Sequence, residues 1–145
     1  MIELMPATAA DHAAVADLLA SHNLPLDGFP DDVPLLLIAK EGEQLVGCAG
    51  IERYGASGLL RSVAVVAEMH GRGLGHRLTA AIIDMAQANG IDALYLLTET
   101  AAHFFPKFGF APTTRDDVPE SVKRSVEFTG ACPASALVMV RHQAG

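Results

Sequence analysis

The sequence predicts an α/β fold in which helices flank a mixed, mostly antiparallel central sheet. Three observations lead to this prediction. The apolar runs 35–41 and 44–54 are separated by a short turn at Gly42, which is typical of an antiparallel hairpin. The next strand, 59–66, turns through glycines into an amphipathic helix. The run 93–97 follows that helix, and a strand reached through a helical crossover lies parallel to the strand before it.

The length and charge of the chain limit the possible functions. We expect residues 1–145 to form one domain with a conventional core. The chain has no long apolar run and no basic, then apolar, N-terminal region, so we expect a cytoplasmic protein without a membrane partner. We expect this protein to be a monomer or a homodimer. The net charge of −7 argues against nucleic acid as a partner. Two cysteines, Cys48 and Cys132, cannot form a disulfide framework or a closed zinc site, and no metal is expected.

The elements before the glycines follow from their local patterns. Residues 2–6 alternate as a short strand, and Thr8-x-x-Asp11 resembles a capping box before a helix that ends near Asn23. The segment 24–34 holds three prolines and a glycine, which predicts a loop or a broken helix.

The elements after the glycines continue the alternation of helix and strand. In order, we expect a helix ending at Asn89-Gly90, the strand 93–97, a short helix 101–108 capped by Thr100, a loop with a short helix from Pro119, and the last strand at 135–141.

The stretch 63–78 has the properties of a phosphate-binding site. A helix that starts after a strand and glycines has backbone N–H groups without intrahelical partners, and its dipole adds partial positive charge. Gly71, Gly73 and Gly75 allow an anion to approach closely because they carry no Cβ. A dinucleotide fingerprint would need glycine in place of His76, and a P-loop would need Gly-Lys-Ser/Thr, so neither motif is present.

The segment His70-Gly-Arg-Gly-Leu-Gly75 resembles the coenzyme A loop of the GCN5-related N-acetyltransferases, the GNAT family. His70 stands where that family has Arg or Gln, and Ala67 stands where it often has proline. The resemblance implies acetyl-CoA as co-substrate. The residues that it implies in binding acetyl-CoA are Val63, Ala64, Val65, His70, Gly71, Arg72, Gly73, Leu74, Gly75, His76, Thr98 and Phe105.

A second resemblance lies in Phe104-Phe-Pro-Lys-Phe-Gly-Phe110, where the family commonly shows an aromatic pair, two variable residues and Phe-Gly-Phe. Two motifs in the family's order imply the GNAT fold, whose sheet is splayed between two parallel strands. Within the family, four segments are similar to the subgroup found in arsenic-resistance gene clusters, namely 59–65, 96–98, 119–128 and 132–135.

Acetyl transfer from a thioester to an amine needs a polarised carbonyl, a deprotonated amine and a proton for the leaving thiol. We expect the backbone N–H of Val65 to polarise the carbonyl. Glu52 lies late in its strand, where the family often carries a catalytic base, although it could instead be a solvated carboxylate or the partner of an arginine. Arg61 and Ser62 are candidates for binding the acceptor, and Arg61 could equally belong to a surface ion pair.

The family often supplies the proton from a tyrosine at the position of Phe105, which has no proton to donate. The thiol could leave as a thiolate and be protonated by water, or His103 or Thr98 could serve. The resemblance implies an N-acetyltransferase that moves acetyl from acetyl-CoA to a small amine by direct attack in a ternary complex. Two other functions stay open: a catalytically silent acyl-CoA sensor, and an enzyme that acetylates a protein amine.

Overall fold

The computed structural model describes residues 1–99, 101–131 and 135–143. Its centre is a seven-stranded sheet in the order β1-β2-β3-β4-β5-β7-β6. The strands are β1 (Ile2–Pro6), β2 (Leu35–Glu41), β3 (Gln44–Tyr54), β4 (Ser57–Val65), β5 (Ala93–Thr98), β6 (Ala111–Thr113) and β7 (Leu137–His142). The α-helices are α1 (His12–Ser21), α2 (Leu74–Ala88) and α3 (Glu120–Lys123), and short helical turns include η2 (Ala67–Met69), η3 (Phe105–Phe108) and η5 (Glu127–Ala131).

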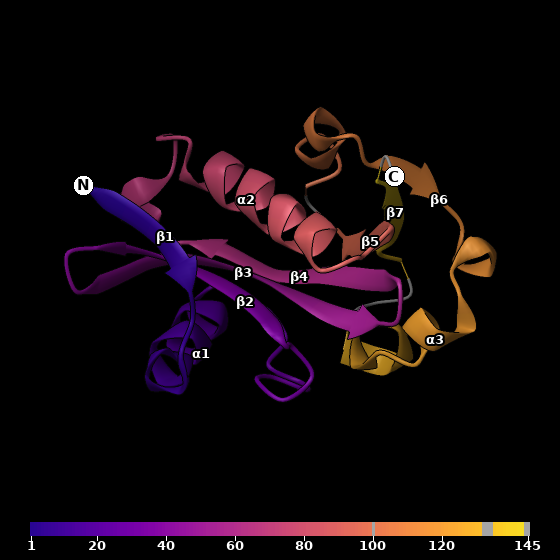
Figure 1. Ribbon diagram of the computed structural model, residues 1–145, viewed down its shortest axis with the longest axis horizontal. Coiled ribbons are helices and arrows are strands. Elements are labelled where there is room, and N and C mark those ends of the chain that lie inside the picture. The colour runs from indigo at the N-terminus through magenta and orange to yellow at the C-terminus, as the bar shows by residue number, and fades with distance from the viewer. Residues whose placement is uncertain (100, 132–134, 144–145) are drawn as a thin grey trace.

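The sheet forms a central layer between helices. Figure 1 shows α2 over one face, with α1 and α3 on the opposite face. Leu74, Leu78 and Ile82 recur at helical spacing on α2 and are buried against the sheet. On the other face, Val15 and Leu19 of α1 are fully buried. Burying a side chain of this kind stabilises the fold by about 1.5–3 kcal/mol, so both helices are held firmly to the sheet.

The mixed sheet confirms the predicted fold class. Strands β2, β3 and β4 are antiparallel neighbours, and β4 pairs with β5 in parallel. Helix α2 provides the crossover between these two strands, and its C-terminal end is followed by Gly90 with φ of 78°. The predicted hairpin and the predicted parallel pair are therefore both present.

Two predicted segments differ from the structure. The helix expected at 101–108 is only η3, because Pro106 has no N–H for an α-helical bond and Gly109 adopts φ of 88° directly afterwards. Thr98 Oγ1 accepts a hydrogen bond from Ala101 N–H at 3.0 Å. Thr100 lies outside the described residues, as does Cys132.

The segment after Phe110 contains a strand where the sequence predicts a loop. Strand β6 pairs with β7 at the edge of the sheet, and Pro112 lies within it. Proline is tolerated on an edge strand because no further strand needs its missing N–H. Within the described ranges, no helix is long and apolar enough to cross a membrane.

Candidate functional site

The strands β4 and β5 separate along their length, and the gap between them forms the candidate site. Their parallel ladder joins only residues 57–59 to residues 93–95. Both strands continue beyond it, β4 to Val65 and β5 to Thr98. Their final residues therefore do not hydrogen-bond across the gap, and an extended ligand can approach the free edge of β4.

A β-bulge in β4 places two neighbouring polar side chains together. The pairing moves from Cys48 to Gly50 on β3 while β4 moves from Ala64 to Arg61, so β4 carries one extra residue. Ser62 adopts φ of 61° at this point. Arg61 Nε donates to Ser62 Oγ at 3.1 Å, although consecutive side chains in a regular strand point to opposite faces.

Cys48 supports the bulge from the neighbouring strand. Its Sγ donates to Ser62 O at 3.1 Å. Burial raises the pKa of the Cys48 thiol to about 12, so the group stays protonated near neutral pH. A thiol that stays protonated is a poor nucleophile, because the thiolate is the nucleophilic form.

A cavity of about 520 Å³ lies at the end of β4 and the start of α2, and we call it the loop cavity. Phe104 and Lys107 complete its wall from the far side. The predicted residues that line it are Val63, Ala64, Val65, His70, Gly71, Gly73, Leu74, Gly75 and His76. Arg72 is not part of the lining, and its Nη1 lies 3.9 Å from Met69 Sδ.

The start of α2 directs backbone donors at the loop cavity. Gly73, with φ of 78°, precedes the helix, and the first backbone bond of the helix runs from Arg77 N–H to Gly73 O at 3.0 Å. In the described chain, the N–H groups of residues 74–76 donate to no backbone carbonyl. A phosphate group suits these donors because the helix dipole favours negative charge at this end. Lys107 adds a full positive charge to the lining.

The backbone of Val65 faces the gap. Val66 N–H donates to Val46 O at 2.9 Å, and because such bonds alternate along a strand, the N–H and C=O of Val65 point away from β3. Val65 O accepts hydrogen bonds from His22 Nε2 and His70 Nε2, both at 2.8 Å. The two imidazole rings stack with their centroids 5.9 Å apart. Val65 N–H thus points to the side on which a ligand would lie.

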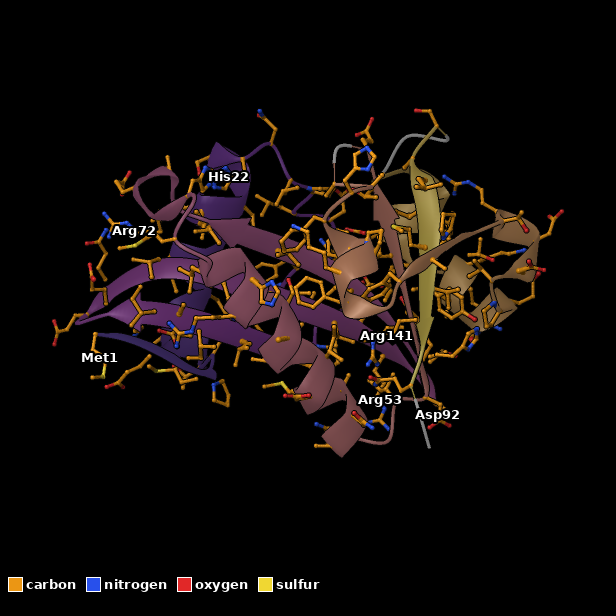
Figure 2. The ribbon with its side chains drawn as sticks, turned by 90° about the horizontal axis from the view of Figure 1, so that it is seen from above. Met1, His22, Arg53, Arg72, Asp92 and Arg141 are labelled. Carbon is orange, nitrogen blue, oxygen red and sulfur yellow. The ribbon has the colours of Figure 1, made fainter. Side chains whose placement is uncertain are left out.

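The labelled residues in Figure 2 show which end of α2 lies near Val65. Figure 2 shows His22 and Arg72 at the end where α2 begins, and Arg53, Asp92 and Arg141 at the opposite end. His22, which donates to Val65 O, therefore lies at the same end of the molecule as the N-terminus of α2.

A second cavity of about 240 Å³ lies deeper in the gap, and we call it the strand cavity. It shares Val63 and Phe104 with the loop cavity, so the two are adjacent. Its lining is mostly apolar. The predicted residues Arg61, Ser62, Thr98 and Phe105 all contribute to it, and so does Glu127, which sequence reasoning did not select.

Arg61 is the centre of a buried polar network. Its Nη1 donates to Glu52 Oε2 and to Asp27 O, both at 2.8 Å, and its Nη2 donates to Pro25 O at 3.0 Å. Its Nε lies 3.3 Å from Glu127 Oε2. Arg61 therefore holds the loop 24–34, which we call the proline-rich loop, to β4, and it contacts two carboxylates. It belongs to an ion pair as the sequence allowed, but a buried one and not a surface one.

Glu52 is held on both of its oxygens. Oε2 accepts from Arg61, and Oε1 accepts from the Tyr54 hydroxyl. Burial, together with the bond to Glu52, raises the pKa of Tyr54 to about 12. Glu52 lines neither cavity. The structure thus makes Glu52 the partner of an arginine, which is one of the alternatives that the sequence left open, while its role as a base stays a prediction.

Two residues of the site escape sequence reasoning. His22 follows α1, and Glu127 begins η5, so both are far from the two sequence motifs. The only signal for Glu127 is that it falls in 119–128, one of the segments similar to the arsenic-resistance subgroup. The described residues contain no group of three or more His, Cys, Asp and Glu side chains placed to hold a metal ion.

Comparison with known proteins identifies the family. The family model described as "Acetyltransferase (GNAT) domain" matches residues 33–112, more than half of the chain. The amino-acid acetyltransferase of Neisseria meningitidis serogroup A is 30% identical over 95 residues, which are 64% of this chain and 22% of that protein. The amino-acid acetyltransferase of Ralstonia nicotianae is 33% identical over 82 residues, 55% of this chain and 18% of that protein. The chain thus spans about a fifth of the length of these relatives.

Solved structures share the fold. N-acetylglutamate synthase from Neisseria gonorrhoeae, complexed with coenzyme A and L-arginine, superposes with a TM-score of 0.80 at 23% identity, covering 99% of this chain and 34% of that one. Rv2747 from Mycobacterium tuberculosis, in complex with CoA, gives a TM-score of 0.81 at 20% identity over 98% of this chain and 99% of that one. With the matched family model, the splayed sheet and the glycine loop at the start of α2, these findings show that the chain belongs to the GNAT acetyltransferase family.

Proposed function

We propose that this protein is an N-acetyltransferase that moves acetyl from acetyl-CoA to the amine of a small molecule by direct attack in a ternary complex. The observation that carries the proposal is the contact between the two cavities, which share Val63 and Phe104. One cavity carries helix N-terminal donors suited to phosphate, and the other carries a buried carboxylate suited to an amine. Membership of the family, and CoA in similar structures, support acetyl-CoA as the co-substrate.

The residues present fit acetyl-CoA. The N–H groups at the start of α2 and Lys107 would hold the diphosphate, and the free edge of β4 would hold the extended arm of the molecule. When bound, acetyl-CoA supplies an activated acetyl thioester. Val65 N–H would polarise the thioester carbonyl. His22 and His70 hold the next peptide group, between Val65 and Val66, through Val65 O.

The acceptor would lie in the strand cavity. Ser62 and Thr98 offer hydroxyl groups there, and Glu127 offers a carboxylate. Glu52 is the base predicted from the sequence, and it shares Arg61 with Glu127. The names of the curated relatives support amino acids as candidate acceptors. The similarity to the arsenic-resistance subgroup supports testing amino-acid-like arsenicals. A cytoplasmic location is part of the proposal.

A thiol-release assay tests this function. Purified protein is mixed with acetyl-CoA and one acceptor at a time from a panel of amino acids, polyamines, aminoglycosides and amino-acid-like arsenicals, and free CoA is measured. We expect at least one acceptor to raise the release of CoA above the rate without acceptor. A protein that binds acetyl-CoA tightly, but releases CoA no faster than buffer with every acceptor, would instead be the acyl-CoA sensor. Phe105, which has no hydroxyl, favours that second candidate.

A further inference from the structure

Two buried carboxylates share one arginine but have different surroundings. Glu52 Oε2 lies 2.8 Å from Arg61 Nη1, and Glu127 Oε2 lies 3.3 Å from Arg61 Nε. Both side chains are buried, at 1% and 6% exposure. They come from different elements, since Glu52 is on β3 and Glu127 is the first residue of η5.

Glu52 is turned away from the cavities. One of its oxygens accepts from Tyr54 and the other from Arg61, and its side chain lines neither cavity. An acceptor amine could reach Glu52 only by displacing one of these partners. Breaking such a buried contact is costly, because a buried charge depends on its hydrogen bonds. The contacts therefore favour a positioning role for Glu52, in which it holds Arg61.

Glu127 is placed differently. It lines the strand cavity together with Val63 and Phe105, next to the edge of β4 where the acetyl group would be presented. Its backbone N–H donates to Ser125 Oγ at 3.1 Å, which fixes the start of η5. Arg61 carries one positive charge for the two carboxylates that it contacts, so this group of three side chains favours a cationic amine, and water screens that attraction little in a mostly apolar cavity.

We infer that Glu127 is the carboxylate that contacts the acceptor amine and removes its proton, while Glu52 positions Arg61. The inference rests on the proposed function. The acceptor enters as an ammonium ion, and Glu127 takes one proton from it. The nitrogen lone pair then forms the bond to the acetyl carbon while the carbon–sulfur bond breaks. The second proton leaves nitrogen and ends on the CoA sulfur, and Glu127 releases its own proton to water. Ammonium and thioester thus give amide, thiol and one proton.

The test compares pH profiles of kcat/KM for three variants, using the acceptor that turns over fastest in the panel. Glu127→Gln should lower kcat/KM near pH 7 by about 10²-fold or more. This deficit should shrink as the pH approaches the acceptor's own pKa, because the amine then arrives deprotonated. Glu52→Gln should lower kcat/KM by a factor that does not change with pH. Glu120→Gln is the matched control, since its side chain is 83% exposed and lines neither cavity.

Two results would overturn the inference while leaving the proposed function intact. One is a Glu127→Gln enzyme with the wild-type profile. The other is a Glu127→Gln enzyme that folds and binds CoA normally but has a constant deficit at every pH, which indicates a structural role. If Glu127→Gln does not fold, Glu127→Asp is the second test. This variant retains the carboxylate, so we expect a pH profile of kcat/KM with the wild-type shape at a lower rate. A profile displaced toward the pKa of the amine would refute the assignment. A wild-type protein that turns over no acceptor refutes both proposals together.

Discussion

Arg61 Nη1 donates to Glu52 Oε2 across 2.8 Å, and each of these side chains is only 1% exposed. The pair joins β3 to β4 at the bulge, and the same arginine reaches the proline-rich loop through two backbone carbonyls. A buried ion pair of this kind contributes little net stability compared with an apolar pair. Removing one partner is nevertheless strongly destabilising, because the remaining charge stays buried.

Arg61→Met should therefore lower the free energy of unfolding by about 3–5 kcal/mol. Urea denaturation followed by circular dichroism measures this change. Arg53→Met is the control, since Arg53 is exposed on the same hairpin and its Nε donates only to Gly55 O within the described chain. The control should change stability by less than about 0.5 kcal/mol. Equal effects of the two substitutions would show that the network around Arg61 does not hold the fold.

Gly75→Val should weaken CoA binding without unfolding the protein. A Cβ at Gly75 would lie 3.8 Å from Val65 Cγ2 and 3.9 Å from Phe104 Cζ, which is ordinary contact, so the backbone need not move. The methyl groups of valine would then occupy the loop cavity. We expect the Kd for CoA to rise at least tenfold, or about 1.4 kcal/mol, by calorimetry. Ala88→Val places the same side chain at the exposed end of α2 and should leave the Kd unchanged.

Stability should fall with rising pH through the ionisation of Tyr54. Burial, followed by its bond to Glu52, raises the pKa of this phenol from 10.0 to about 12 in the folded state. Between these values the unfolded chain has released the proton and the folded chain has retained it. The free energy of unfolding therefore decreases as the pH rises from about 10 to 12. Tyr54→Phe should flatten this decrease in urea denaturation, and an unchanged slope in the variant would contradict the assignment.

Phe105→Tyr tests whether the leaving thiol needs a side-chain acid. Phe105 is buried and lines the strand cavity, so a phenol there would reach the site. If the thiol leaves as a thiolate, the added hydroxyl should keep kcat the same or raise it, because a donor acts only late in the reaction. Phe110→Tyr is the control for the size of the added group, since Phe110 is buried but lines neither cavity. A tenfold fall in kcat for Phe105→Tyr alone would contradict this reading.

The sequence predicts the features that depend on neighbouring residues. The apolar run 44–54 and the helical spacing after Gly73 predict β3 and α2 correctly, because burial imposes these patterns on short segments. The glycines predict the helix N-terminus that faces the loop cavity. The hairpin turn and the parallel crossover then follow from general rules of connection.

The rest of the site depends on contacts between distant segments. His22 reaches Val65 only because α1 packs across the sheet, and Glu127 reaches Arg61 only because η5 folds back over the gap. The bulge at Ser62 also has no local signal, since a serine with positive φ is unusual.

The most direct test of the central claim is an initial-rate measurement in which acetyl-CoA and the best acceptor of the panel are both varied. Direct attack across the adjoining cavities requires both substrates to be bound together, so we predict CoA release with double-reciprocal lines that intersect. Parallel lines would instead indicate that acetyl is first transferred to the protein, the kinetic fingerprint of a covalent intermediate. Either parallel lines, or CoA release no faster than in buffer for every acceptor, would contradict acetyl transfer by direct attack at this site.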